Sequence, residues 1–330
     1  MANTTISDVI VPSVFAAYVQ ELSTELSLLV RSGVVATSPA LDSFLSGGGT
    51  FIDMPFWNDL ADTEANISGD DVSVTSSTEE ITAAKTIAIR NNRNQSWSAS
   101  DLAGSLAGSD PMSAIAQRVA SYWVRQDQAQ LNAVLKGLVA GTASLVNDIA
   151  EGAAGTPAAE NLFSSNALLD TFQLMGDHKQ NVRAIAVHSV IHTAMQKANL
   201  IDFVSDSEAN VGFGTYMGKT LIVDDGIATT TDGTNTEYFT VCYGAGAFQL
   251  GNGSPRVAAE VTREALAANG GGQEILTSRK EYALHPAGFT VKSTVAAGQS
   301  PTNTELSASD AYSLTVARKN IPMAILKSNG

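Results

Sequence analysis

The sequence predicts an α+β fold, and three of its stretches carry that prediction. Residues 110–141 place apolar side chains every three or four positions, which indicates one long helix with a single buried face. Residues 142–270 alternate short helical and strand patterns, as a mixed domain does. Residues 50–90 hold two strand-like runs joined by a polar stretch, which is typical of a long hairpin. With 330 residues the chain has room for about two domains.

The N-terminal part combines helix and extended chain. A helical stripe is formed there by Val14, Tyr18, Leu22, Leu26 and Leu29 or Val30. Gly33 is expected to end that helix, and a second, short helix is expected over residues 41–45. Gly47-Gly48-Gly49 follows at once. Three glycines in a row have little local conformational preference, so they predict a hinge or a tight crossing point.

The predicted hairpin has an acidic connection. Its strands are residues 50–57 and 81–90, with Pro55 tolerable only at an edge or bulge. From Asp59 to Glu80 there are seven acidic residues and no basic one. Little in this stretch could fill a core of its own. We therefore expect the hairpin to project and to rest on a neighbouring molecule, and an ordinary flexible surface loop is the alternative.

The long helix is expected to begin at Asp110-Pro111, because Asp can cap free backbone N–H groups and Pro suits the first turn. Its buried stripe consists of Ile115, Val119, Tyr122, Trp123, Leu131, Val134, Leu135 and Leu138. No glycine or proline interrupts the stripe before Gly137 and Gly141. This predicts about 25 helical residues, roughly 40 Å. Because the flanking segments are mostly strands, we expect the helix to lie on a sheet.

The remaining elements are short. Expected helices cover residues 166–175, 189–198 and 306–316. Expected strands cover residues 182–187, 219–223, 236–243, 257–263, 274–282, 289–291 and 321–326. Gly251-Asn252-Gly253 is interpreted as a turn between two of these strands, and Gly270-Gly271-Gly272 as the exit from the compact part.

Composition excludes several classes of protein. The net charge of −14 argues against a protein that holds nucleic acid through a broad basic face. No run of ~18 apolar residues occurs, so no membrane span is predicted. Charged residues make up 16% of the chain, against about 25% in ordinary soluble domains. Interface cores are depleted in charge, so the surface is expected to be buried against copies of the same chain. An extracellular or halotolerant protein with a Ser/Thr-rich surface is the alternative.

The single cysteine and the N-terminus bear on location. Cys242 excludes an intramolecular disulfide framework, and its apolar surroundings in the sequence predict a buried, inert thiol. The first residues lack a basic region followed by an apolar core, so no signal peptide is predicted. We expect the protein to be made and assembled in cytoplasm.

No motif predicts catalysis, a cofactor or a metal. Gly218-Lys219-Thr220 lacks the earlier glycine of a phosphate-binding loop and leads into a strand, so it is interpreted as a turn. His188 and His192 share one helix face, but no third ligand or general base accompanies them. Asp224-Asp225 fits a turn, and Gly244-Ala245-Gly246 lacks the third glycine of a dinucleotide site.

Several different short signatures follow one another along the chain in a defined order. They are Asp8 to Phe15 with Tyr18, Gly48 to Trp57, Asp110-Pro111, Met175 to His178, Ala186 to Ser189, Val223 to Asp225, Gly244 to Ala247, and Leu284 to Phe289. In this order they resemble the major capsid proteins of tailed bacteriophages, the family with the HK97-type fold. The resemblance spans nearly the whole chain.

The resemblance implies five regions. Residues 1–50 would be an N-terminal arm and 51–95 the extended loop that lies over an adjacent subunit. Residues 96–141 would form the peripheral domain with its spine helix. Residues 142–270 would be the axial domain, which meets its copies around five- and six-fold axes. Residues 271–330 would add peripheral-domain strands and the C-terminal return.

The implied function is an icosahedral shell of hexamers and pentamers around double-stranded DNA. The acidic balance agrees, because a wall that repels DNA leaves it mobile. Separate scaffolding, portal or decoration proteins are the expected partners, with assembly in the cytoplasm of a bacterial host. Three alternatives stay open: an encapsulin-like compartment, a fibre, decoration or adhesin protein, and an enzyme that uses His188 and His192.

Candidate contacts between subunits lie near the hairpin. They are Phe51, Phe56, Trp57, Lys85, Arg90, Arg93 and Trp97. The aromatic side chains could equally form a small core beneath the hairpin. Some members of the family join a loop lysine to a distant asparagine, and Lys85 is the lysine of this hairpin. No motif identifies a partner asparagine, so a covalent cross-link is not predicted.

Overall fold

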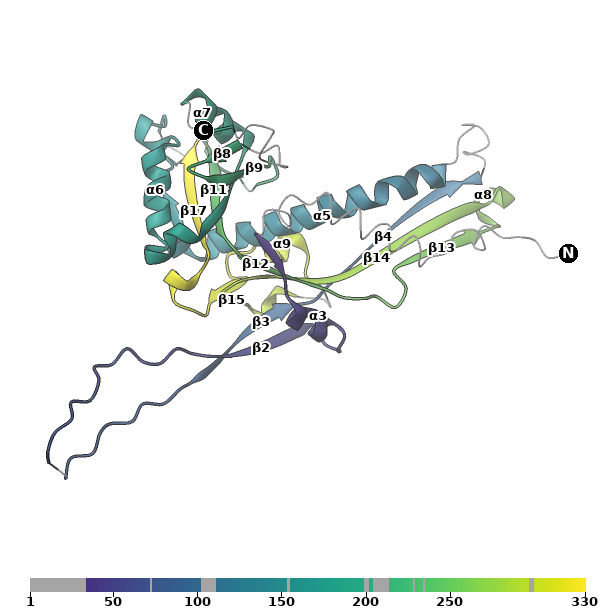
Figure 1. Cartoon of the computed structure of the whole chain (residues 1–330). Coiled ribbons are helices and arrows are strands. Elements are labelled where there is room, and N and C mark those ends of the chain that lie inside the picture. Colours follow the sequence, from purple (N-terminus) through teal and green to yellow (C-terminus); the bar gives the residue numbers. More distant parts are fainter. Residues whose placement is uncertain are drawn as a thin grey trace.

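The computed structural model describes residues 34–71, 73–101, 111–152, 155–198, 202–203, 214–227, 229–233, 235–296 and 300–330. The helix expected from Val14 onward and the capping residue Asp110 lie outside these residues. The body contains two large sheets, and the long helix α5 (Pro111–Gly141) runs past both of them (Figure 1). The prediction of an α+β fold is confirmed.

The first sheet is built around the long strand β14 (Gln273–Pro286). One side of β14 pairs with β4 (Asn91–Ser100) over ten residues. The other side pairs with β12 (Phe248–Asn252) and β13 (Ala259–Glu264), and β1 (Val35–Thr37) adds to β12 in parallel. The resulting sheet is long and narrow (Figure 1).

Helix α5 lies along this sheet through a polar seam. Trp123 Nε1 donates to Ser278 Oγ at 2.9 Å, Lys280 Nζ donates to Asp127 Oδ1 at 2.7 Å, and the Tyr282 hydroxyl donates to Gln130 Oε1. The partners follow one another in the same order on both elements. The helix steps by four and then three residues, about 6 Å and 4.5 Å, while the strand steps by two residues each time, about 6.8 Å. We call these three pairs the seam. The 31-residue helix spans about 46 Å, so the predicted long helix on a sheet is confirmed.

The second sheet has eight strands. Its order is β5 (Val146–Asp148), β17 (Met323–Asn329), β11 (Asn235–Gly244), β6 (Val182–Val187), β9 (Lys219–Val223), β8 (Gly214–Tyr216) and β7 (Asp202–Phe203), with β10 (Thr229–Asp232) on β11. Helices α6 (Ser165–Gln173) and α7 (Ser189–Lys197) pack against it through an apolar cluster. The central strand β6 is almost wholly buried, as expected for a strand covered on both faces.

The largest apolar cluster lies where both sheets meet the second half of α5, at Leu131, Val134, Leu135 and Leu138. The helix continues through Gly137, and residues 306–312 of the same chain pack directly against this glycine. A Cβ atom at Gly137 would lie 2.9 Å from Tyr312 Cε2 and would overlap the Leu306 carbonyl oxygen. Here glycine permits close packing inside the helix and does not end it.

Two expectations about the later segments are wrong. The helix expected over residues 306–316 is one turn, α9 (Asn303–Leu306), followed by strand β16 (Tyr312–Leu314), which pairs with β15 (Phe289–Val291). Ser307, Ser309 and Asp310 favour turns over helix, which explains the error. Gly251-Asn252-Gly253 was expected to be a turn between two strands, but its first two residues belong to strand β12, which extends to Asn252.

The remaining short elements are α8 (Ala267–Gly270), η2 (Ala143–Leu145), η3 (Ala159–Asn161), η4 (Gly176–Asn181), η5 (Ser293–Val295) and η6 (Arg318–Asn320). The strands expected over 182–187, 219–223 and 289–291 are confirmed at both ends. So is the turn at Gly218, where Met217 and Gly218 both have positive φ between β8 and β9.

Candidate assembly surface

The expected hairpin is present and projects from the body (Figure 1). Strands β2 (Phe51–Trp57) and β3 (Ala83–Ile89) pair antiparallel from Phe51 opposite Ile89 to Trp57 opposite Ala83. Beyond them, residues 58–82 form what we call the extended loop. Every described residue from 59 to 82 is exposed to solvent.

Polar bridges hold the two arms of the extended loop together. Near its root, the Asn58 side-chain amide donates to Thr82 Oγ1 at 2.9 Å, and the Asn58 N–H donates to the Thr82 carbonyl at 2.9 Å. Further out, Asn66 Nδ2 donates to the Ser77 carbonyl at 2.9 Å and its Oδ1 accepts from the Ser77 hydroxyl at 2.8 Å. None of the described loop residues contributes to an apolar core.

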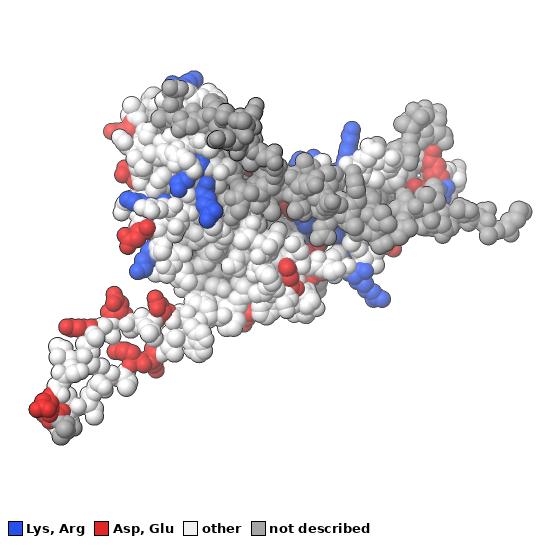
Figure 2. All heavy atoms as spheres, viewed as in Figure 1, with Lys and Arg blue, Asp and Glu red and all other residues white. Residues whose placement is uncertain are grey.

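The surface of the extended loop carries both carboxylates and large apolar side chains. Its carboxylates are Asp59, Asp62, Glu64, Asp70, Asp71, Glu79 and Glu80, and Figure 2 shows them along both arms and at the tip. Hydrogen bonds from the Ser73 hydroxyl and N–H lower the pKa of Asp71. Ile67 is 89% exposed and Trp57, at the root, 69%; Leu60, Val74 and Ile81 are exposed as well. Several exposed large apolar side chains on one projection mark an interaction surface.

The predicted contact residues divide into two groups. Phe51, Phe56, Trp57 and Lys85 lie on the hairpin, where Phe56 is half-buried and the other three are exposed. Lys85 Nζ lies 2.7 Å from Asp53 Oδ2 in a solvent-exposed ion pair, which contributes little to stability.

The second group, Arg90, Arg93 and Trp97, makes its contacts inside the subunit. Arg90 pairs with Glu281 of β14, and Arg93 Nη2 donates to the Pro301 carbonyl and, at 3.2 Å, to Asn303 Oδ1. The Trp97 ring meets Tyr122 of α5 edge-on, with centroids 5.1 Å apart. A contact between subunits stays a prediction for all seven residues.

The sequence reasoning missed four exposed apolar residues of the extended loop. Leu60, Ile67, Val74 and Ile81 follow one another at intervals of seven in a stretch whose other residues are mostly polar. Such spacing was a usable signal, because an isolated aliphatic residue in an acidic, core-free segment has no partner within its own subunit.

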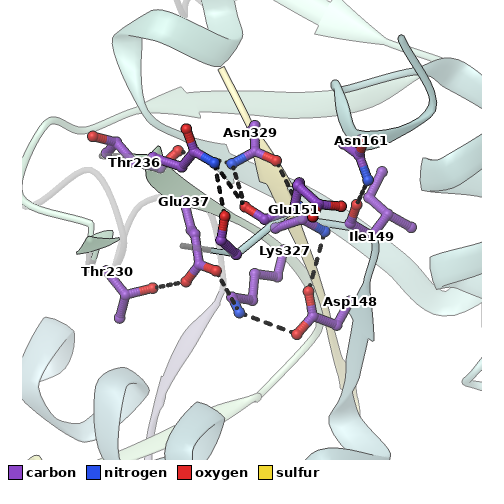
Figure 3. Close-up of polar contacts among 12 residues, drawn as sticks. Asp148, Ile149, Glu151, Asn161, Thr230, Thr236, Glu237, Lys327 and Asn329 are labelled. Atoms are coloured by element: carbon purple, nitrogen blue, oxygen red, sulfur yellow. Dashed lines mark hydrogen bonds and ion pairs between the residues drawn. The ribbon is translucent and has the colours of Figure 1, made fainter. Parts of the chain in front are cut away.

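A second polar cluster fastens the C-terminal strand β17 (Figure 3). Lys327 Nζ lies 2.9 Å from Glu237 Oε1 of β11 and 3.1 Å from Asp148 Oδ2 of β5, and the Thr230 hydroxyl donates to Glu237. Desolvation acts to lower the pKa of Lys327, but the hydrogen bonds to both carboxylates outweigh it and raise the pKa. The amine is therefore held as a charged ammonium, a poor nucleophile, and the cluster joins four strands, β5, β10, β11 and β17.

The residues considered for chemistry are used structurally. His188 Nδ1 accepts the Val190 N–H at 3.2 Å at the start of α7. Cys242 is fully buried, and burial raises the pKa of its thiol. Within the described ranges, no three His, Cys, Asp or Glu side chains are placed to hold a metal ion. None of the helices that the structure describes is both long and apolar enough to cross a membrane.

A projecting hairpin, a long helix on a long sheet and a second compact sheet are the parts that the HK97-type resemblance implies. Residues 46–320 match the family model described as Gp13-like, major capsid protein 13-like. The chain belongs to this family. It is 38% identical to the major capsid protein of Bacillus phage SPP1 over 309 residues, which cover 93% of this chain and 92% of that protein.

Solved capsid structures share the fold. The cyanophage Pam1 capsid subunit superposes with a TM-score of 0.54 at 12% identity and covers 88% of each chain. The capsid of Ralstonia phage GP4 gives 0.50 at 11% identity, over 77% of this chain and 82% of that one. The fold is HK97-like, and the chain is a major capsid protein of a tailed phage, located in the virion capsid. The family and its SPP1 member are viral, so they give the encapsulin alternative no support.

Proposed function

We propose that copies of this chain assemble as hexamers and pentamers into an icosahedral shell around double-stranded DNA, and that each extended loop lies over a neighbouring subunit. The role is structural, without a catalytic step. One observation carries the proposal: the described part of the extended loop exposes Leu60, Ile67, Val74 and Ile81, with Trp57 exposed at its root, and adds no residue to an apolar core. Such a segment gains stability only when another molecule covers it.

Shell formation then depends on repeated contacts between identical subunits. Different surfaces of two copies meet head to tail, and such contacts close into rings and shells when the rotation permits. The low charged fraction of 16% suits a chain that buries much of its outside in this way. Overlapping loops would add contacts across each capsomer, so that many modest interfaces resist internal pressure together.

The proposal also assigns the regions and partners. Residues 1–50 serve as the arm, 51–95 as the hairpin that carries the extended loop, 96–141 and 271–330 mainly as the peripheral domain, and 142–270 mainly as the axial domain. Three strands cross this division, because β12 and β13 pair with β14 in the first sheet and β17 lies in the second. Separate scaffolding, portal or decoration proteins take part, and assembly takes place in the cytoplasm of the bacterial host. The net charge of −14 suits a wall that does not bind the enclosed DNA.

Deletion of residues 60–80 tests the loop. The cut leaves the bridge between Asn58 and Thr82 in place, so circular dichroism and the thermal midpoint of the subunit should stay near the wild-type values. Electron microscopy should show few or no closed shells. A chain in which the same residues are replaced by an equally long Gly/Ser segment controls for loop length, and it should fail as well. Normal shells from either chain would contradict the proposal.

The enclosed material is tested separately. Shells from infected cells should protect double-stranded DNA from nuclease, and gels of purified shells should lack a stoichiometric protein cargo. Shells that hold an enzyme and no DNA would favour a compartment over a virion.

A further inference from the structure

Arg90 occupies the junction between the hairpin and the body. It is the single residue between β3, which belongs to the hairpin, and β4, which pairs along β14. Its backbone N–H donates to the Thr50 carbonyl at 2.9 Å, so the hairpin ladder extends to this residue. Arg90 therefore lies where the hairpin leaves the body. The base of the hairpin also meets the body through the apolar cluster of Ile52 and Ala88 with Leu41, Leu45 and Ala283, and through the hydrogen bond from the Ile87 N–H to Thr290 Oγ1 at 2.7 Å.

The guanidinium of Arg90 joins two parts of the body. Nη1 lies 3.2 Å from Glu281 Oε1 on β14, and these side chains are only 14% and 15% exposed. Nη2 donates to the Leu45 carbonyl at 2.8 Å and to the Gly47 carbonyl, at the end of helix α3 (Pro39–Leu45). A cation suits a helix C-terminus, where carbonyl groups lack partners.

Helix α3 is itself fixed to the first sheet. Asp42 Oδ1 accepts the Asn252 N–H of β12 at 2.7 Å. A Cβ atom at Gly251 would lie 2.5 Å from Leu41 Cβ, so helix and strand are in close contact. Arg90 thus ties the hairpin to an element that cannot move freely.

The other chain segment that leads into the hairpin is rich in glycine. Gly47, Gly48 and Gly49 link α3 to β2, and Gly49 has φ of +115°. A side chain at Gly48 would meet nothing within 4 Å. Glycine gives this segment the most conformational freedom of any residue, so it does not define a direction by itself.

We infer that Arg90 is a positioning residue for assembly: it fixes the direction of the hairpin by clamping it to the end of α3 and to Glu281. The inference rests on the proposal that the extended loop lies over a neighbour, since only then does its direction matter. Lysine cannot replace Arg90, because one ammonium lacks the planar fork that reaches carbonyls and a carboxylate together.

The test uses the full chain with Arg90→Lys and Arg90→Met. Arg279→Met is the matched control. Arg279 lies on β14 itself, pairs with Glu260 of β13 at 2.9 Å and donates to the Val257 carbonyl, and neither of these partners belongs to the hairpin. Hydrogen exchange is measured on unassembled subunits at the amides of Ile52 and Arg90 and, as an internal reference, at β14. Closed shells are counted by electron microscopy.

Both Arg90 variants should exchange these hairpin amides at least about tenfold faster while β14 amides stay protected. Closed shells should fall several-fold, with open or irregular assemblies in their place. The control should change neither quantity. In the Arg90→Lys chain, Gly48→Ala should restore part of the shell yield, because it reduces the freedom of the glycine segment without a clash. A residue that merely stabilised the fold would speed exchange at β14 as well as at the hairpin.

Two results would overturn the inference. Normal shells from both Arg90 variants would show that the clamp does not set assembly. Lost shells with unchanged hairpin exchange would show that Arg90 acts in a contact between subunits instead. Failure of the proposed function is distinct from both, because it appears as normal shells from the chain without residues 60–80, whatever the Arg90 variants do.

Discussion

The extended loop and the seam between α5 and β14 differ in where their side chains find contacts. At the seam, Trp123 and Leu276 are buried beside the polar pairs, so the subunit itself supplies the partners of these side chains. The extended loop has two polar bridges, an acidic surface and apolar side chains that the described part of the subunit leaves exposed. The sequence of the seam therefore specifies the fold of the subunit, whereas the sequence of the extended loop is suited to contacts with other copies.

The largest effect is expected at the seam. Trp123→Ala removes a side chain that is 3% exposed and leaves Ser278 without its indole donor. Such a cavity costs about 3–5 kcal/mol of unfolding free energy. Urea denaturation of the unassembled subunit measures it. A loss below about 1 kcal/mol would mean that the seam does not carry the fold and that the contrast with the loop is false.

Acid should weaken the body through His285, which lies on β14 and is 2% exposed. Burial lowers its pKa to about 4, against 6.5 in the unfolded chain. The unfolded state alone takes up the proton between these values, so the stabilising contribution is complete above pH 6.5 and is lost as the pH falls towards 4. The loss is about 3 kcal/mol at most.

The measurement for His285 compares denaturation of the wild type and His285→Gln from pH 7 to pH 4. Carboxylates titrate in both proteins, so the difference between the two curves isolates the histidine. Parallel curves would show that His285 takes up its proton in the folded state at its ordinary pKa.

Gly137→Ala should distinguish a packed glycine from a free one. The new methyl would lie 2.9 Å from Tyr312 Cε2 and overlap the Leu306 carbonyl, so about 1–3 kcal/mol should be lost. Gly48→Ala, at the hairpin hinge, meets nothing within 4 Å and should be neutral or slightly stabilising. Thermal unfolding of both variants measures this, and equal midpoints would remove the proposed difference between body and hinge.

The sequence predicts the body better than the attachments. The stripe from Val119 to Leu138 and the central strands repeat their apolar residues at the period of their own structure, so local pattern and final packing agree. The prediction for the segment after Thr302 was wrong because its apolar spacing suits a helix. In the structure Tyr312 lies on a strand that pairs with β15. That pairing is a tertiary contact, which the local pattern does not contain.

The candidate surface was predicted in outline. The acidic, core-free stretch and its flanking strands predicted the hairpin, and Trp57, one of the candidate contact residues, is exposed. Arg90 could not be placed in the same way. Its role depends on Glu281 and the end of α3, which lie 191 and 45 residues away and meet only in the folded chain.

Trp57→Ala should have the smallest effect on the fold and a clear one on assembly. The side chain is 69% exposed at the root of the extended loop, opposite Ala83, so the unfolding free energy of the subunit should change by no more than about 0.5 kcal/mol. Aromatic side chains dominate binding energy at interfaces, so the yield of closed shells should fall. Leu266→Ala is the control, because Leu266 is also highly exposed but lies on the body. If Trp57→Ala and the control give equal yields of closed shells, the exposed root of the loop is not a contact between subunits. The assembly surface would then begin nearer the tip of the loop.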